Sequence, residues 1–224
     1  MKTITIGGLT ADLFLPTQCP MEGAIYILDA FRQDFTKFPD LTDRKNALVF
    51  LSGMDWDRDL SPWPAPPLYP KEEPFGGRAD DFLADLLTKI IPEIEMAMPA
   101  KPCDRQLAGV SLAGLFAVYA ACRSEAFSRI ASISGSLWYD GLTDFLTSHA
   151  PSPALSHAYF SLGSKEKNVR NARMRTVETC TATIAALWQS KGIRTYFELN
   201  PGNHFADGPL RILKALRWLE NTES

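Results

Sequence analysis

A serine at position 111 stands where a β-strand pattern gives way to a helix of small residues. Residues 106–118 read Gln-Leu-Ala-Gly-Val-Ser-Leu-Ala-Gly-Leu-Phe-Ala-Val. In a nucleophile elbow, a sharp strand-to-helix turn presents a serine hydroxyl, and the residues two before and two after it must be small. Gly109 and Ala113 meet this demand, with alanine in place of the usual second glycine. The segment predicts Ser111 as a nucleophile for acyl transfer; the alternative is a tight turn in which Ser111 only caps the helix.

Such a serine needs backbone N–H groups that stabilise the negatively charged oxygen of its tetrahedral intermediate. Leu112 begins the expected helix, so its N–H has no partner within the helix and is free to donate. A second donor is expected in the loop after the strand predicted at 24–28. We select the amide of Ala30 there, with Phe31 as the alternative.

The general base has to come from three histidines, His149, His157 and His204. Hydrolases with an elbow of this kind order their triad along the chain as serine, acid, histidine. Only His204 follows the last predicted strand, at 194–199, and it lies in a turn-rich segment before the final helix. His204 is therefore the predicted base, the alternative being a loop histidine bonded to nearby backbone.

The acid of a triad should follow the strand predicted at 158–162. The next loop reads Gly-Ser-Lys-Glu-Lys-Asn, and Glu166 is its only carboxylate. Such an acid fixes the histidine tautomer and stabilises the imidazolium. Asp140, which follows the preceding predicted strand, is the alternative acid. A dyad of Ser111 and His204 without an acid also stays open.

The elements that must position these residues alternate between short apolar runs and helical patterns. The runs are continuously apolar, which is typical of parallel strands covered on both faces. Strands alternating with helices predict an α/β fold with a mostly parallel sheet and helices on both faces. The expected strands are 24–28, 47–51, 106–110, 130–134, 158–162 and 194–199, and the expected helices are 78–91, 172–190 and 208–220.

Three local features add to this plan. Residues 2–6 and 11–15 predict an N-terminal hairpin joined across two glycines. Pro92 is expected to end or kink the helix at 78–91, because proline lacks the N–H that a helix needs. In the last helix, leucines at spacings of three, from Leu210 to Leu219, are expected to face the core.

A stretch rich in proline and aromatic residues, 52–77, interrupts the alternation. Six prolines fall within 62–74 and deny the backbone regular hydrogen bonds. Long loops in compact domains are often functional, and the aromatic content argues against disorder. We expect one wall of a substrate pocket here, with Trp56 and Trp63 joined by Trp138 from beyond a neighbouring strand; a surface loop packing its own tryptophans is the alternative.

Length and composition exclude several classes of protein. The 224 residues, 46% hydrophobic and 22% charged, predict one domain spanning 1–224 without a separate cap domain. A net charge of −3 argues against nucleic-acid binding, and no apolar run reaches the length of a membrane span. The basic segment 165–175 is read as a solvated face, with recognition of an anion as its alternative.

Cysteine usage and the N-terminus bear on location. The four cysteines lack a zinc-binding spacing, so no metal or cofactor is expected. The first residues show no secretory signal, and we expect a cytoplasmic protein with free thiols. The four are Cys19, Cys103, Cys122 and Cys180.

Three segments carry a resemblance to a known family. Residues 109–117 read Gly-Val-Ser-Leu-Ala-Gly-Leu-Phe-Ala, residues 134–138 read Ser-Gly-Ser-Leu-Trp, and residues 202–205 read Gly-Asn-His-Phe. Together they resemble the esterase family of the α/β-hydrolase fold that includes esterase D relatives and siderophore trilactone esterases. The resemblance spans nearly the whole chain and implies an α/β-hydrolase that cleaves carboxylic esters.

The resemblance also touches the oxyanion loop and the acid. Leu28-Asp29 before Ala30 is similar to the Leu-Asp-Gly loop of relatives, with alanine replacing glycine. Residues 162–166, Leu-Gly-Ser-Lys-Glu, are similar to a Leu-Gly-Asp-x-Glu pattern of bacterial members, which implies Glu166 as the acid. Some siderophore esterases of the family use a Ser-His dyad.

We therefore predict a serine hydrolase that cleaves a small-molecule ester through an acyl-Ser111 intermediate, with His204 as base and Glu166 as acid. A siderophore-type trilactone esterase is one alternative. An acyltransferase or thioesterase would use the same site. A non-catalytic binding protein is least favoured, because serine and histidine are both present. Self-association into a homo-oligomer is left open.

Overall fold

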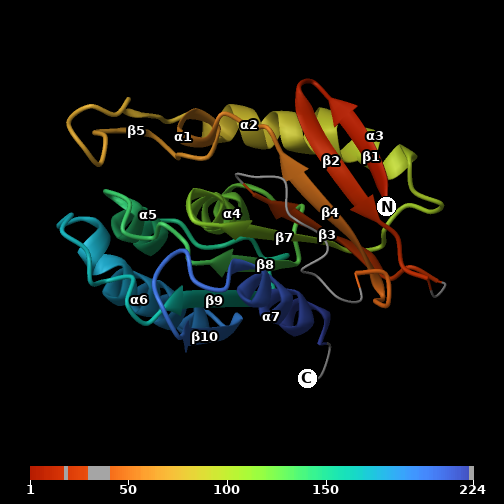
Figure 1. Cartoon of the computed structure of the whole chain (residues 1–224). Coiled ribbons are helices and arrows are strands. Elements are labelled where there is room, and N and C mark those ends of the chain that lie inside the picture. The colour runs from red at the N-terminus through yellow and green to blue at the C-terminus, as the bar shows by residue number, and fades with distance from the viewer. Residues whose placement is uncertain (18–19, 30–40, 222–224) are drawn as a thin grey trace.

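An eight-stranded sheet forms the centre of the computed structural model, which describes residues 1–17, 20–29 and 41–221 (Figure 1). The strands are β1 (Lys2–Ile6), β2 (Leu9–Phe14), β3 (Gly23–Leu28), β4 (Asn46–Ser52), β7 (Arg105–Val110), β8 (Arg129–Ile133), β9 (His157–Gly163) and β10 (Arg194–Asn200). Their order is β1-β2-β4-β3-β7-β8-β9-β10. The six strands β4, β3, β7, β8, β9 and β10 are parallel to one another. In contrast, β1 pairs antiparallel with β2, and β2 pairs antiparallel with β4. The predicted hairpin is thus the antiparallel edge of the predicted parallel sheet.

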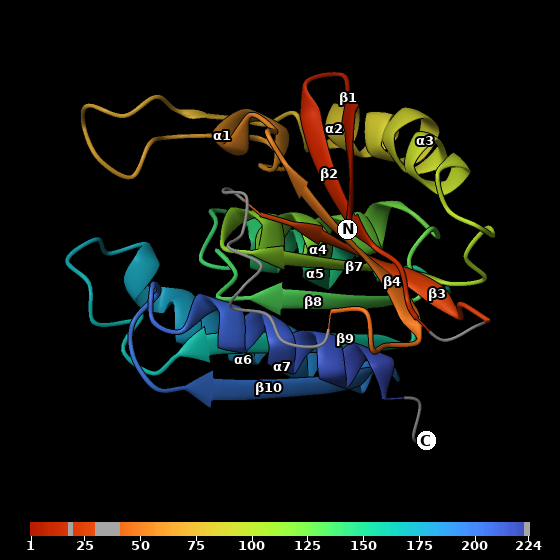
Figure 2. The same cartoon turned by 45° about the vertical axis from the view of Figure 1, so that its right-hand side comes forward.

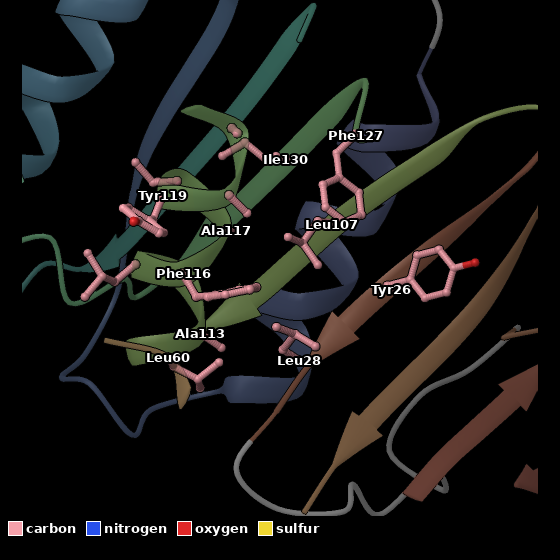
Figure 3. Close-up of a cluster of buried hydrophobic side chains, with 14 of the residues drawn as sticks. Tyr26, Leu28, Leu60, Leu107, Ala113, Phe116, Ala117, Tyr119, Phe127 and Ile130 are labelled. Carbon is pink, nitrogen blue, oxygen red and sulfur yellow. The ribbon is translucent and has the colours of Figure 1, made fainter. Parts of the chain in front are cut away.

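The parallel strands are apolar throughout because both faces of the sheet are covered. In β3, Ala24, Tyr26 and Leu28 belong to one core cluster, while Ile25 and Ile27 belong to another on the opposite face. This alternation follows from the two-residue period of a strand. Figure 3 shows part of the larger cluster, where helix side chains pack on the strands.

The helices divide between these two faces. In Figure 2, α7 lies in front of the sheet, while α4 and α5 lie behind it. Side chains of α2, α3, α4 and α6 join the larger cluster, and those of α7 join the smaller one. The helices are α1 (Trp56–Asp59), α2 (Ala79–Asp85), α3 (Ile91–Met96), α4 (Leu112–Arg123), α5 (Leu142–Ser148), α6 (Val177–Ser190) and α7 (Gly208–Glu220), with a π-helix η2 (Leu86–Ile90) and a 3₁₀-helix η3 (Met174–Thr176).

Pro92 does not end its helix. The helix continues through η2 and α3 to Met96, and the Ile91 N–H bonds to the Leu86 carbonyl across a widened turn. A π-helical turn changes the hydrogen-bond register and so accommodates a residue without an N–H. Of the two outcomes expected at this proline, an end of the helix is contradicted, whereas the π-helical turn just before Pro92 is a local distortion of the helix. The element is longer than its apolar pattern indicated.

In α7 the buried stripe differs from the expected one. Leu210 is half exposed, while Arg211 is 1% exposed and lies in line with buried Ala215 and Leu219, at spacings of four. Leu213 and Leu216 are buried as expected. The helix thus turns a charged residue inward where the leucine spacing predicted a leucine.

The stretch 52–77 is partly ordered into short elements. It contains α1 and a two-stranded antiparallel ribbon of β5 (Pro64–Ala65) and β6 (Phe75–Gly76). Gly77, at φ +69°, lies so close to Pro64 that a Cβ would come within 2.3 Å of its nitrogen. The stretch is therefore a folded arm along the carboxyl ends of the strands, where the sequence indicated only a stiff loop.

Three of the four cysteines, Cys103, Cys122 and Cys180, are free thiols. Burial raises the pKa of the Cys122 thiol to about 12, so it is not a thiolate nucleophile. Cys19 lies outside the described residues. Within the described ranges, no helix is both long and apolar enough to cross a membrane.

Candidate active site

Ser111 occupies the turn between β7 and α4 with a strained backbone. Its φ is +58° and its ψ −120°, which is rare for a residue other than glycine. Small neighbours make the turn feasible: a Cβ on Gly109 would lie 2.2 Å from the Ala113 carbonyl oxygen, and one on Gly114 would lie 2.9 Å from Gly135 Cα. The chain therefore crosses itself closely here, and the hydroxyl is presented at the end of the strand.

Replacing Gly109 by alanine should collapse this turn. A Cβ 2.2 Å from backbone cannot be relieved by a side-chain rotation, so we expect a loss of about 3 kcal/mol in the free energy of unfolding. Gly208→Ala is the matched control, because its Cβ would meet nothing within 4 Å. Urea unfolding of both variants checks this; equal stabilities would contradict the steric account.

The His204 ring bridges Ser111 and Glu166. Its Nε2 lies 3.1 Å from Ser111 Oγ, and its Nδ1 lies 2.8 Å from Glu166 Oε2. His204 comes from the loop between β10 and α7, and Glu166 from the turn after β9. A proton on Nδ1 donates to the carboxylate and leaves Nε2 to accept the serine O–H. This is the geometry of a nucleophile, a base and an orienting acid.

Glu166 is buried, at 6% exposure. Burial acts to raise its pKa, but hydrogen bonds from His204 and the Gly163 N–H outweigh it, so the pKa of Glu166 lies below its ordinary value. The Arg211 guanidinium also donates to Glu166, over 3.0 Å. The carboxylate is thus held in the ionised form that an imidazolium partner requires.

Asp140, the alternative acid, forms an ion pair away from His204. Its carboxylate pairs with Arg173, with a shortest separation of 2.9 Å. Arg173 also stacks on Trp138, 5.3 Å from the ring centroid, and donates to the carbonyl of Pro66. Arg173, from the segment 165–175, is therefore engaged in holding the arm 52–77, and Asp140 belongs to that support.

The two predicted oxyanion donors differ in how far the structure describes them. Leu112 is the first residue of α4, so its N–H points out of the helix start beside Ser111. Ala30 and Phe31 lie outside the described residues. The pairing of β3 with β7 places the end of β3 next to Gly109, two residues before the serine. The end of β3 therefore lies beside the elbow.

A pocket of about 530 Å³ opens onto Ser111 and His204. Trp56 and Trp138, two of the three tryptophans predicted to bind substrate, line it. The arm 52–77 contributes a wall of mixed aromatic, aliphatic and acidic residues: Trp56, Asp57, Leu68, Tyr69, Glu72, Glu73 and Phe75.

Trp63 does not lie among the lining residues that the structure describes. Its ring packs edge-on against Tyr119 and Tyr139 and beside Phe145, and its Nε1–H donates to the Asp140 carbonyl over 2.9 Å. The prediction of Trp63 as a substrate-binding residue therefore fails. Trp63 instead packs the base of the arm against the body, because it is turned inward at β5.

Sequence reasoning missed Arg211, which contacts Glu166, and the serine pair Ser134 and Ser136 beside the pocket. Arg211 had a recognisable signal, since it shares the i, i+4, i+8 stripe with Ala215 and Leu219. A charged residue in an apolar stripe is rarely buried without a partner. Within the described residues, no group of three or more histidines, cysteines or acidic residues could hold a metal ion.

A comparison with family models identifies the chain. The model described as "Putative esterase" matches residues 10–207. The chain belongs to this esterase family. The esterase is a carboxylic ester hydrolase with a mixed α/β fold and a mostly parallel sheet, as the sequence predicted.

One curated protein and several solved structures are similar to this chain. "Uncharacterized protein YbbA" of Bacillus subtilis (strain 168) is 27% identical to the esterase over 169 residues, 72% of this chain and 68% of that protein. The structure of an IroE-like serine hydrolase from Shewanella oneidensis superposes with a TM-score of 0.77 and 17% identity, covering 95% of this chain and 75% of that one. Siderophore hydrolase EstA from Aspergillus nidulans superposes with a TM-score of 0.73 and 19% identity, covering 95% and 90%.

Proposed function

We propose that the esterase is a serine hydrolase that cleaves small-molecule carboxylic esters through an acyl-Ser111 intermediate. The observation that supports this most is the continuous contact from Ser111 Oγ through the His204 ring to buried Glu166, at 3.1 and 2.8 Å. The strained backbone of Ser111 adds to it, because strain at a non-glycine residue tends to mark functional positions.

In the first half of the reaction, Ser111 Oγ attacks the ester carbonyl carbon while His204 Nε2 takes the hydroxyl proton. The carbonyl oxygen becomes an oxyanion, which the Leu112 N–H at the start of α4 stabilises. A second donor, the amide of Ala30 or Phe31, completes the oxyanion hole in this proposal. The imidazolium then gives its Nε2 proton to the leaving alcohol, and the acyl group stays on Ser111.

In the second half, water replaces the alcohol. His204 Nε2 takes a proton from water as its oxygen attacks the acyl carbon, and the same oxyanion forms again. When the bond to Ser111 Oγ breaks, the proton returns to Oγ and the carboxylic acid leaves. Throughout, Glu166 accepts the Nδ1–H of His204 and stabilises each imidazolium.

This intermediate can be observed directly. Acid quenching during turnover of p-nitrophenyl acetate should leave one acetyl group on the protein, on the peptide that contains Ser111, by mass spectrometry. His204→Gln should abolish that adduct. An acetyl group found on another residue, with turnover unaffected by His204→Gln, would contradict the proposal.

The charges around the pocket indicate which esters enter. Beyond Glu166, the described lining residues include Asp57, Glu72 and Glu73, against one cation, Lys165. Burial raises the pKa of Asp57, and the neighbouring carboxylates Asp55 and Glu72, which add negative charge at this wall, raise it further. We therefore propose that neutral or cationic esters are preferred to anionic ones.

This preference is measurable with p-nitrophenyl acetate against the anionic p-nitrophenyl hemisuccinate. The double variant Glu72→Gln/Glu73→Gln should raise kcat/KM for the anionic ester about fivefold relative to the neutral one, and added salt should diminish the difference. Glu22→Gln, at the opposite ends of the strands, is the control. A trilactone siderophore ester belongs in the same panel, because EstA is described as a siderophore hydrolase. An unchanged ratio would contradict the charge argument.

A further inference from the structure

We infer that Arg211 is a positioning residue, which holds the acid and the base of the triad in register from the opposite face of the sheet. Arg211 lies in the first turns of α7 and is 1% exposed. The inference rests on the proposed function, because it assigns Arg211 a role only through Glu166 and His204. Arg211 is not itself among the described residues that line the pocket, and its hydrogen bonds go to residues other than Ser111.

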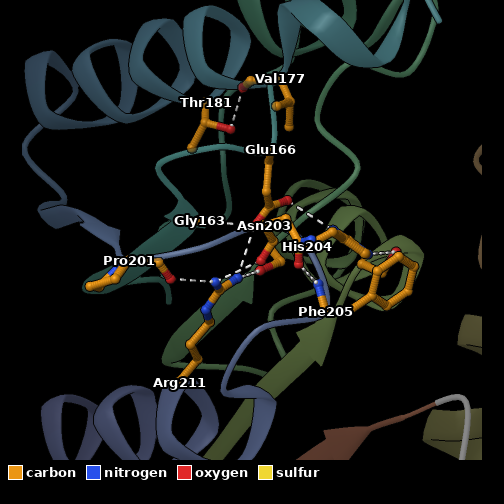
Figure 4. A network of polar contacts seen from close by, with 11 residues as sticks. Gly163, Glu166, Val177, Thr181, Pro201, Asn203, His204, Phe205 and Arg211 are labelled. Carbon is orange, nitrogen blue, oxygen red and sulfur yellow. Dashed lines mark hydrogen bonds and ion pairs between the residues drawn. The ribbon is translucent and has the colours of Figure 1, made fainter. Parts of the chain in front are cut away.

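The guanidinium uses its two terminal nitrogens on four different acceptors. Nη1 donates to Glu166 Oε1 over 3.0 Å and to Ser134 Oγ over 2.8 Å. Nη2 donates to the carbonyls of Pro201 and Asn203, over 3.1 and 2.8 Å. Figure 4 shows the side chain rising from α7 into the centre of this network, below Glu166 and His204.

Each acceptor belongs to a segment that carries or borders the site. Asn203 directly precedes His204, so its carbonyl fixes the backbone from which the base projects. Ser134 follows β8 and lines the pocket. Glu166 is the acid itself. A planar fork of donors with one fixed geometry can therefore set the relative position of the two loops, which a flexible ammonium group would not do.

The two loops that carry Glu166 and His204 pack closely against each other and against Arg211. A Cβ on Gly163 would lie 2.6 Å from the Gly202 carbonyl and 2.7 Å from Arg211 Nη2. The Lys165 N–H donates to the same Gly202 carbonyl over 2.9 Å. The acid loop and the base loop are thus in direct contact, with the guanidinium closing the gap between them.

The charge of Arg211 matters as well as its shape. The two carboxylate oxygens of Glu166 have different partners. Oε2 bonds to His204, whereas Oε1 accepts hydrogen bonds from the Gly163 N–H and from Arg211. The ionisable side chains that bond to one another in this group are Glu166, His204 and Arg211. Removing the buried cation takes away a charge that opposes protonation of the Glu166–His204 pair, so the pair should bind its proton more readily.

The experiment compares Arg211→Met and Arg211→Lys with wild-type enzyme in ester hydrolysis. We expect Arg211→Met to lower kcat about 100-fold with little change in KM, because misplacement of reacting groups by about an ångström has this effect. The acid limb of its kcat/KM profile should move to higher pH. Arg211→Lys should keep the acid limb near wild type while kcat stays at least about tenfold below it, since the charge returns without the fork.

A matched control separates positioning from stability. Arg44 and Glu220 form another largely buried ion pair, at the far end of α7. Arg44→Met should lower thermal stability without moving kcat or the acid limb. Where Arg211→Met does not fold, Arg211→Lys decides: wild-type kcat in Arg211→Lys overturns the inference.

The inference and the proposed function fail separately. If hydrolysis depends on Ser111 but Arg211→Met keeps the wild-type kcat and pH profile, only the role of Arg211 is overturned. An effect of Arg211→Met as large in the Glu166→Gln background as in wild type also overturns it, because Arg211 would then not act through Glu166. If hydrolysis does not depend on Ser111, the proposed function fails first.

Discussion

Ser111→Ala is expected to lower kcat for ester hydrolysis about 10⁴-fold or more. The substitution removes one oxygen, and without it no acyl-enzyme forms, so only the residual effect of binding and oxyanion stabilisation remains. Alanine fits the space of serine, and the backbone strain at φ +58° is about the same for both residues. The variant should therefore unfold at nearly the wild-type temperature.

A pocket serine provides the control for that result. Ser136 is 5% exposed and lines the same pocket. Its contact to the elbow is made by its backbone N–H, which donates to the Ser111 carbonyl over 3.0 Å and survives substitution. Ser136→Ala should keep kcat within about tenfold of wild type. Comparable losses in both serine variants would show that Ser111 is structural.

Glu166→Gln is expected to lower kcat about 10⁴-fold, the second large effect. The amide keeps the shape of the carboxylate but can present an N–H to His204 Nδ1, which favours the wrong tautomer, and it cannot stabilise the imidazolium. Because Arg211 and the Gly163 N–H already donate to Oε1, the amide nitrogen is driven to the side of His204. Steady-state kinetics measures the loss.

The comparison variant for the acid is Asp140→Asn. Asp140 pairs with Arg173, which also bonds to the Pro66 carbonyl in the arm 52–77. Its loss should raise KM modestly by loosening the pocket wall, and should leave kcat within about tenfold of wild type. A larger kcat loss in Asp140→Asn than in Glu166→Gln would move the role of acid to Asp140.

Much of the fold could be predicted because local signals agree with the tertiary structure. Apolar runs with no polar face specify strands covered on both sides, and two glycines between short runs specify the hairpin. An end of the helix at Pro92 and an inward-facing Leu210 were expected but not found, for a shared reason. A π-helical turn carries the helix past Pro92, and in the last helix a buried ion pair takes the inward position; the spacing of the leucines alone indicates neither.

Some residues of the candidate site could likewise be predicted from the sequence, and others could not. Ser111, His204 and Glu166 were predictable as neighbours because each follows the carboxyl end of a parallel strand, and these ends share one edge of the sheet. Trp63 was not, because whether an aromatic residue faces a pocket or the core depends on how the arm folds back. Arg211 acts from the face opposite α4, and no rule about strand ends leads to it.

The proposed function depends above all on Ser111 being the nucleophile that His204 activates. The most direct test is labelling with a fluorophosphonate probe, followed by peptide mapping, on wild type, Ser111→Ala and Ser136→Ala. We predict one phosphonyl group on Ser111 in wild type and in Ser136→Ala, with inhibition in step with labelling, and no label in Ser111→Ala. Wild-type enzyme that hydrolyses esters yet takes no label, or carries it on another residue, would contradict the account.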